Sequence, residues 1–290
     1  MTTTTRSART FSGWRGLGAV APTALVAARE TAHHAAQLLA LTGASLVPAR
    51  SDDSHTSMSW LDDHAALATQ LVDAPRPFRI ALRLHDVTLL ALDARGLATA
   101  AFPLGGQTRA ASLAWLRSRI TAAGRDAAAL RSSLHYTIAP NPTDDGAPFA
   151  LPDDGALPEL ARWYASASAV LEDVAATTAG ASPVACWPHH FDIATLITLP
   201  PGGTLRTIGV GMSPGDGSYA EPYYYVGPYP HPTSRPAALS VGRWHTEGWW
   251  GGALRASEIV GAGDAAAQAA LVRRFIGEGI AALVALPAEG

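Results

Sequence analysis

The sequence contains no lysine, because all 21 of its lysine-or-arginine positions are arginine. A Schiff base with pyridoxal phosphate or with a carbonyl substrate requires the amino group of a lysine. The phosphate-binding loop of nucleotide hydrolases and the ATP site of protein kinases require a lysine too. The absence of lysine therefore excludes these classes, and we expect no pyridoxal phosphate cofactor.

Cysteine is nearly absent as well. Cys186 is the only one, so the chain can form no intramolecular disulfide and no zinc or iron–sulfur site built from several cysteines. Because Cys186 stands between Ala185 and Trp187, we expect a small buried side chain there rather than a nucleophile. A chain without disulfides fits a reducing compartment, and we expect a cytoplasmic protein.

The chain also lacks an excess of charge of one sign and a long uninterrupted apolar run. Its formal net charge is −3, which gives no net attraction to nucleic acid or to anionic lipid. The most apolar segment, 265–286, carries Arg273, Arg274 and Glu278 in its middle, as an amphipathic helix does and a membrane span does not. We expect a soluble protein that binds neither nucleic acid nor a membrane.

What the chain does have is a hydrophobic fraction of 48%, enough for a substantial core, and many short strand-forming runs. In the first half these runs are separated by turn-forming residues and lie at 57–60, 66–72, 78–85, 87–93 and 97–102. Such close spacing predicts an antiparallel meander. Further strands are predicted at 189–199, 204–212 and 222–229.

Helical periodicity occurs at 23–41, 108–123, 126–133, 157–178 and 265–286. The first of these helices is expected to begin after Pro22 and to end at Gly43. Helices and strands are segregated along the chain, which favours an α+β fold with a largely antiparallel sheet packed by helices.

The domain organisation follows from the same pattern. Residues 1–20 are predicted to be a flexible tail, and residues 21–290 a single domain. Alternatively, two halves, 21–138 and 157–290, are joined by the proline- and aspartate-rich loop 139–156.

Residues 186–192, Cys-Trp-Pro-His-His-Phe-Asp, concentrate reactive side chains in seven positions. We expect Pro188 to mark the beginning of the strand 189–199. Because side chains alternate along a strand, His190 and Asp192 would then share one face, opposite Phe191. The sequence therefore predicts His190 and Asp192 as a functional pair.

A histidine and an acidic residue two positions apart occur three times, in Asp53 with His55, His190 with Asp192, and His245 with Glu247. Neutral imidazole and carboxylate groups suit Zn, Fe or Mn as divalent ions. The candidate metal ligands are His190, Asp192, His245, Asp53 and His55, and the candidate catalytic residues are His190, Asp192, His245 and Glu247. Without a metal, His190 would simply hydrogen-bond to Asp192 or to a backbone carbonyl.

Aromatic side chains gather near the later pairs, and together with a few polar groups they are what a small-molecule pocket needs. The candidate ligand-binding residues are Tyr223, Tyr225, Trp244, Trp249, Glu221 and Arg255. The same aromatic residues also suit a core or a subunit interface, so a homo-oligomer is compatible with the sequence.

Residues 211–215 match the G-x-S-x-G pattern of serine hydrolases. In those enzymes the residue after the serine donates its N–H to the oxyanion and begins a helix. Here that residue is Pro214, which has no N–H, so we predict a turn.

Two motifs, Trp-Pro-His-His-Phe-Asp at 187–192 and Glu-Pro-Tyr-Tyr-Tyr at 221–225, resemble an uncharacterised family of bacterial proteins, a domain of unknown function. The resemblance covers roughly residues 157–260. It implies a bacterial, soluble protein and carries no activity with it.

Three functions remain open from the sequence. The first is a small-molecule enzyme with a histidine and carboxylate cleft that holds a divalent metal. The second is a non-catalytic ligand-binding or interaction module that uses the tyrosines and tryptophans as its surface. The third is an iron enzyme, because the order His190, Asp192, His245 and then Arg255 loosely imitates the 2-oxoglutarate-dependent oxygenases.

Overall fold

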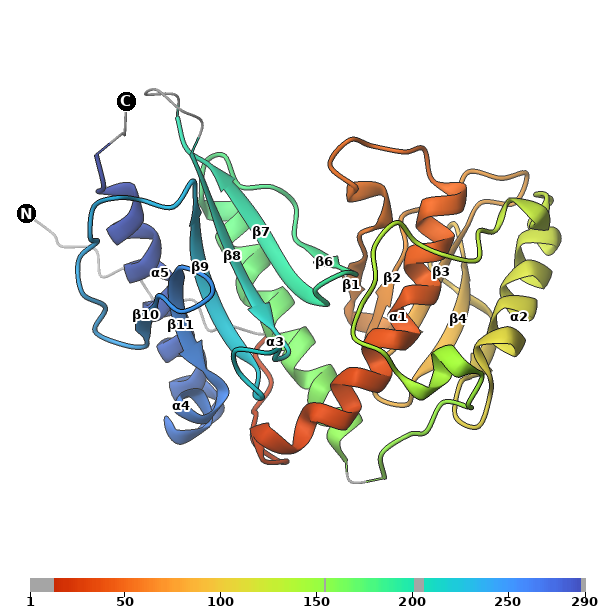
Figure 1. The fold of residues 1–290 in the computed structure, drawn as a ribbon, viewed down its shortest axis with the longest axis horizontal. Helices are drawn as coiled ribbons and strands as arrows, with labels where there is room; N and C mark the ends of the chain where they lie inside the picture. Colours follow the sequence, from red (N-terminus) through yellow and green to blue (C-terminus); the bar gives the residue numbers. More distant parts are fainter. Residues whose placement is uncertain (1–12, 154, 201–205, 288–290) are drawn as a thin grey trace, which may run out of the picture.

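The computed structural model describes residues 13–153, 155–200 and 206–287. They form two antiparallel sheets and five α-helices, which confirms the α+β fold (Figure 1). The first sheet has the order β1-β2-β3-β4-β5 and the second the order β10-β11-β9-β8-β7-β6.

The two halves of the chain follow the same plan. In the first half, helix α1 (Val26–Leu46) precedes a meander of five strands, and helix α2 (Arg109–Ala122) follows it. These strands are β1 (Ser59–Leu61), β2 (Ala66–Ala68), β3 (Phe78–Arg83), β4 (Thr88–Asp93) and β5 (Ala98–Pro103). All five predicted strands of the N-terminal meander are thus confirmed, with small shifts at their ends.

In the second half, helix α3 (Ala156–Thr177) precedes the sheet, and helices α4 (Ala256–Gly261) and α5 (Ala265–Val284) follow it. The strands are β6 (Ala185–Trp187), β7 (Asp192–Thr198), β8 (Thr207–Ser213), β9 (Tyr223–Tyr229), β10 (Arg243–His245) and β11 (Gly251–Arg255). Strand β11 pairs with β9, and β10 is added at the outer edge. The sequence analysis did not identify β6, β10 or β11.

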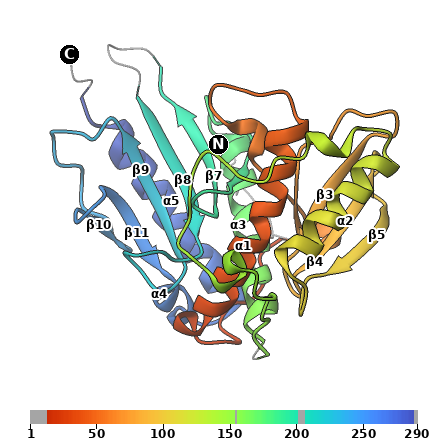
Figure 2. The same cartoon turned by 45° about the vertical axis from the view of Figure 1, so that its right-hand side comes forward.

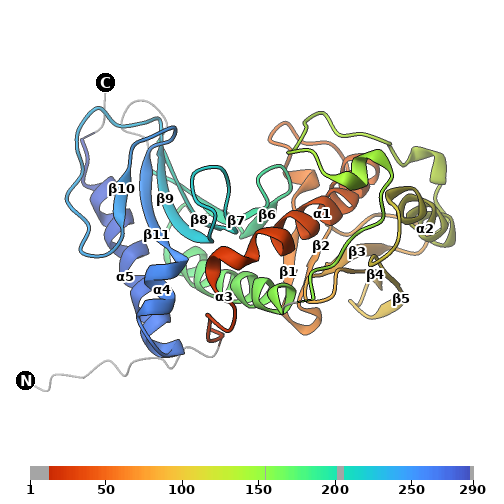
Figure 3. The same cartoon turned by 60° about the horizontal axis from the view of Figure 1, so that its bottom comes forward.

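The two sheets meet at the edges formed by β1 and β6 (Figure 1), and α1 lies between the two sheets in the view of Figure 2. Next to these strands the backbones of Met58 and Cys186 exchange two hydrogen bonds, of 2.9 and 2.7 Å. Helices α1 and α3 contact each other beneath this junction (Figure 3). One cluster of buried apolar side chains runs through both halves, so they share a core.

Helix α1 is longer than predicted, because Gly43 does not end it. A Cβ atom at Gly43 would lie 2.7 Å from the backbone oxygen of His55. The glycine therefore allows the segment 54–56 to pack closely against the helix.

The segment 126–133, predicted as a helix, contains only the 3-10 turn Ala127–Ala129. The linking loop contains a second such turn, Pro142–Asp145, which has a capping box made by Asn141 and Asp144. The helices predicted at 108–123, 157–178 and 265–286 are found as α2, α3 and α5.

The predicted tail is packed wherever it is described. Residues 1–12 lie outside the described residues, but Leu17 is buried and its N–H donates to Gln268 on α5. The N–H of Arg15 donates to Ser166 on α3. The segment 13–20 is therefore part of the folded structure, contrary to the prediction. Within the described ranges, no helix is both long and apolar enough to cross a membrane.

Candidate functional site

The motif at 187–192 is a β-hairpin turn, not the beginning of a strand as predicted. Strand β6 ends at Trp187, which pairs with Asp192 at the start of β7, and Pro188–Phe191 form the turn between them. Pro188 adopts this turn readily because its φ is fixed. The strand alternation used to pair His190 with Asp192 therefore does not apply, because His190 lies in the turn.

The turn is attached to helix α1. The carbonyl oxygen of Pro188 accepts hydrogen bonds from His33 Nε2 at 2.9 Å and from Gln37 Nε2 at 2.8 Å. A carbonyl only accepts, so Nε2 of His33 carries the proton. Burial is the largest cause that lowers the pKa of His33, to about 4, so its ring is neutral at pH 7.

Phe191, the last residue of the turn, anchors it in the core. Its side chain is fully buried between the two helices, stacked on His33 at 5.1 Å and tilted against Tyr164 at 5.2 Å. The Tyr164 hydroxyl donates to the backbone oxygen of Phe191. The backbone φ of Phe191 is +57°, a strained conformation for a bulky residue, which this burial holds in place.

Asp192 is the central group of the site. Its Oδ2 accepts a hydrogen bond from the Tyr225 hydroxyl, whereas its Oδ1 is buried and has no hydrogen-bond partner among the described residues. Burial raises the pKa of this carboxyl, and the Tyr225 bond and the nearby His190 only partly oppose it. Asp192 therefore keeps its proton to a higher pH than an ordinary aspartate does.

Gly211 positions the tyrosine that bonds to Asp192. It lies directly opposite Tyr225 in the β8–β9 pair, and a Cβ atom there would be 2.5 Å from the Tyr225 hydroxyl oxygen. It would also be 2.8 Å from the Cβ of Ala194. A glycine is needed here because the phenol ring lies across the strand.

Two hollows flank His190, which is itself exposed at the tip of the turn. The smaller, of about 260 Å³, is lined by the rings of Trp187, His189 and Tyr225 and by Asp192. The larger, of about 370 Å³, lies between α1 and the loop 214–217 and is lined by Arg29, His33, His190 and Asp216. Both halves of the chain thus contribute walls to the site.

Asp53 lies at the rim of this site, whereas its predicted partner His55 does not. Asp53 pairs with His135 at 3.2 Å and acts electrostatically on His189. His55 is buried, and its Nδ1 accepts the N–H of Arg50 at 3.2 Å. The predicted pair is therefore divided between the rim and the core.

His245 and Glu247 do not converge with Asp192. Both ring nitrogens of His245 have protein partners, the Tyr219 hydroxyl at 2.8 Å and the backbone oxygen of Glu247 at 2.6 Å. The ring also stacks on Trp249 at 4.3 Å, and the Glu247 side chain is exposed. His245 thus belongs to a neighbouring aromatic cluster.

That cluster reaches the site through ring contacts and through a hydrogen bond to Asp216. Tyr223 is 4.9 Å from Tyr219, 5.9 Å from Trp249 and 6.4 Å from Tyr225, measured between ring centroids. The Tyr223 hydroxyl donates to Asp216 at 2.6 Å. Tyr223 and Tyr225 therefore support the two carboxylates, and neither forms an exposed binding surface.

The other predicted ligand-binding residues have structural partners. Glu221 accepts the N–H and hydroxyl of Ser257 at the start of α4, and Arg255 pairs with Glu258 at 3.1 Å. Trp244 stacks on Trp250 and lines a separate hollow beside 232–236.

The five predicted metal ligands are not brought together. Among the described residues, no group of three or more His, Cys, Asp or Glu side chains could hold a metal ion. The second sheet is a single open sheet rather than a double-stranded barrel, and His245 has no free ring nitrogen. The geometry thus gives no support to the 2-oxoglutarate oxygenase arrangement.

Two of the other interpretations are confirmed. Cys186 is fully buried, and burial raises the pKa of its thiol well above the usual range. Ser213 ends β8 and is followed by a turn instead of a helix, with its hydroxyl accepting the N–H of Gly215.

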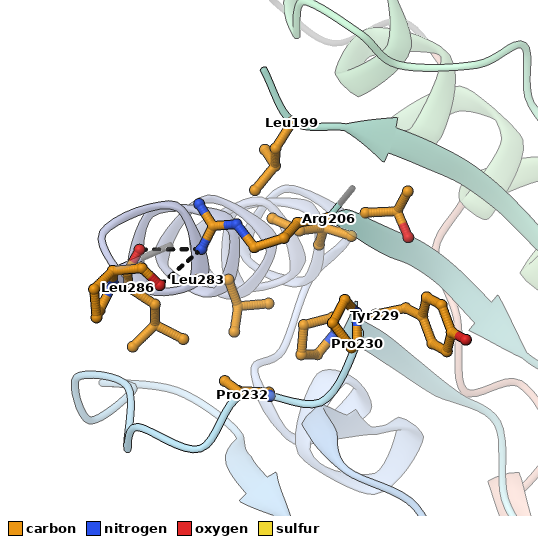
Figure 4. A pocket seen from close by; sticks show the side chains of 11 residues that line it. Leu199, Arg206, Tyr229, Pro230, Pro232, Leu283 and Leu286 are labelled. Carbon is orange, nitrogen blue, oxygen red and sulfur yellow. Dashed lines mark hydrogen bonds between the residues drawn. The ribbon is translucent and has the colours of Figure 1, made fainter. Parts of the chain in front are cut away.

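A further hollow, of about 160 Å³, lies at the far end of the second sheet (Figure 4). Its walls are mainly leucine and proline side chains from β9, α5 and the segments that follow them, and Leu199 just after β7. Among the described residues that line it, the one charged side chain is Arg206, whose Nη1 donates to the carbonyls of Leu286 and Pro287. The charged group of this hollow therefore already has protein partners.

Arg29 and His33 also line the site, although the sequence did not lead us to predict them. They are four residues apart on α1 and so lie on one face of the helix, both at the larger hollow. Helical spacing of polar residues in an otherwise apolar helix is the signal that would have found them.

No family model, no curated protein and no solved structure matches the chain.

Proposed function

We propose that the protein is an enzyme that binds a small polar molecule beside the turn 188–191 and transfers a proton to or from it through Asp192. The observation that carries this proposal is the buried, unpartnered Oδ1 of a carboxyl that lines a hollow. A buried polar atom without a partner is costly, and such groups concentrate where a ligand supplies the missing hydrogen bond.

The neighbouring groups support an acid–base role. A carboxyl of raised pKa that lines a hollow is typical of a general acid or base. The Tyr225 hydroxyl fixes Oδ2 and leaves Oδ1 for the ligand. His190 is exposed at the same hollow, where its imidazole can donate or accept a hydrogen bond with the ligand.

The test is turnover of a panel of chromogenic esters, amides and glycosides, followed by the same assay on variants. We expect Asp192→Asn to lower kcat/KM about 100-fold or more, the usual contribution of a general acid or base. The wild-type rate should fall on the alkaline side of the pKa of Asp192 for a substrate to which Asp192 donates a proton, and on the acid side for one from which it accepts a proton.

His64→Ala is the matched control. His64 lies in the equivalent turn of the first sheet, where its Nε2 contacts the Gly96 oxygen at 2.8 Å. We expect this variant to keep the wild-type rate. An Asp192→Asn protein with wild-type turnover would contradict the proposal.

A further inference from the structure

The larger hollow contains a positive charge that the described residues leave largely unbalanced. Arg29 lines this hollow with 15% of its side chain exposed. Its Nη1 is buried and has no hydrogen-bond partner among the described residues. Its Nη2 is 3.6 Å from Glu30 Oε1, which is beyond hydrogen-bond distance, and Glu30 is 56% exposed to water. Exposed pairs of this kind are weak.

The carboxylate on the opposite wall already has its own partners. Asp216 Oδ1 accepts the backbone N–H groups of Ser218 at 2.7 Å and of Tyr219 at 3.1 Å. Its Oδ2 accepts the Tyr223 hydroxyl at 2.6 Å. Three donors thus satisfy Asp216 within its own loop and β9, and it does not pair with Arg29.

His33 is the other basic side chain of α1 that lines this hollow, and its ring is neutral at pH 7. Arg29 is therefore the positively charged group on the α1 side of the hollow, and a positive charge there favours an anion.

The loop that covers Arg29 is shaped around the guanidinium. Gly215 has a φ of +108°, and a Cβ atom at this position would lie 2.5 Å from Arg29 Nη1. Only glycine combines this backbone conformation with such close contact. Packing against this loop thus holds Arg29 at the hollow, in addition to its ion pair with Glu30.

From these contacts we propose that Arg29 binds an anionic group, a carboxylate or a phosphate, of the ligand. A guanidinium offers donors in a planar fork that matches both groups. The inference deepens the proposed function, on which it rests for one point only: the other end of the same ligand reaches Asp192 across His190, which lines both hollows. The substrate class is therefore a small anion with a group that exchanges a proton.

Inorganic phosphate and malonate are the probes, each added at constant ionic strength against sodium chloride. A ligand that binds only the folded state raises the melting temperature with its concentration. We expect one or both anions to protect the wild type, and the stronger of the two identifies the phosphate or the carboxylate as the preferred group. Arg29→Gln should bind that anion at least tenfold more weakly.

Arg95→Gln is the matched control, because Arg95 is exposed in the turn between β4 and β5, away from either hollow. It should bind as the wild type does. If Arg29→Gln does not fold, Arg29→Lys keeps the charge but not the fork, and it should bind several-fold more weakly than the wild type.

Equal protection of the wild type and the Arg29 variants, or no protection of the wild type by either anion, would overturn the inference. Asp192→Asn separates the two proposals. We expect it to keep the affinity for the anion while it loses turnover. Anion binding thus tests Arg29 alone, and turnover tests Asp192 alone.

Discussion

The hairpins β1–β2 and β6–β7 have the same geometry and opposite chemistry. Each has a four-residue turn whose last residue is left-handed, Ala65 at φ +47° and Phe191 at φ +57°. The first turn is Asp-Asp-His-Ala, and it is held at the surface by an Arg15–Asp62 ion pair of 2.7 Å. The second is Pro-His-His-Phe, and it is inserted between α1 and α3.

The two sheets also differ in the strands that follow these hairpins. In the first sheet, Ala81 lies opposite Leu90 and belongs to a small apolar cluster. At the equivalent place in the second sheet, Gly211 lies opposite Tyr225, which reaches Asp192. The same backbone thus supports plain packing in one half and a polar site in the other, and a few side chains make the difference.

The largest expected difference concerns the left-handed residues. Phe191→Gly should lower the free energy of unfolding by about 3 kcal/mol, because the loss of a buried phenyl ring outweighs the relief of strain. Ala65→Gly, at the equivalent position, should change it by less than about 1 kcal/mol. Urea denaturation measures both, and equal effects would show that the turns are anchored alike.

The second prediction concerns the attachment of the second turn to α1. The pKa of His33 is lowered from 6.5 to about 4, so the unfolded chain takes up a proton between these values while the folded protein does not. Stability should therefore fall as the pH decreases from about 6.5 to 4, by on the order of 3 kcal/mol.

His33→Gln should lack most of this loss and can still donate to the Pro188 oxygen. The exposed His231 provides the control, because His231→Gln should follow the wild-type curve. Parallel curves for the wild type and His33→Gln would show that another group causes the pH dependence.

Gly211→Ala comes next in size. The added methyl group would clash with Tyr225 and Ala194, so we expect a loss of about 2 kcal/mol and a weakened bond from Tyr225 to Asp192. Gly277→Ala in α5, where a Cβ atom meets nothing within 4 Å, should instead stabilise the protein by up to about 1 kcal/mol. Thermal unfolding distinguishes the two, and a harmless Gly211→Ala would mean that Tyr225 need not lie across the strand.

The smallest predicted effect is a gain in stability, not a loss. Because burial raises the pKa of Asp192, the ionised carboxyl lowers the stability of the folded state at a pH above that pKa. Asp192→Asn should therefore be more stable than the wild type at pH 8, by about 1 kcal/mol, and the gain should shrink as the pH falls. Asp63→Asn in the exposed first turn should stay within about 0.5 kcal/mol at either pH.

The elements with strong periodicity were predictable from sequence, and the turns that make the site were not. Alternation and turn residues located the five strands of the first sheet, and apolar spacing located α2, α3 and α5. The strand β6 was missed because the strand was predicted to begin at Pro188, which lies in the turn after β6, and the parity assigned to His190 then failed. Gly43 was wrongly predicted to end a helix. Its close contact with the backbone of His55 leaves no signal in the local sequence.

Of the predicted site, Asp192 and His190 share one hollow and Tyr225 supports it. His245 and Glu247 have the same spacing as this pair but lie in another cluster. The sequence could not show this, because spacing along the chain does not indicate which segments are neighbours in the fold. Arg29 and His33 come from the other half of the chain, and only the tertiary structure places them beside the turn.

The pair of backbone hydrogen bonds between Met58 and Cys186 joins the two halves of the protein. It joins the edges of the two sheets, and both halves of the chain contribute walls to the larger hollow. A molecule that touches α1 on one side and β7 on the other therefore acts as a second fastener, and its binding energy adds to the cohesion between the halves. Such a molecule should therefore make the two halves harder to separate as more of it binds.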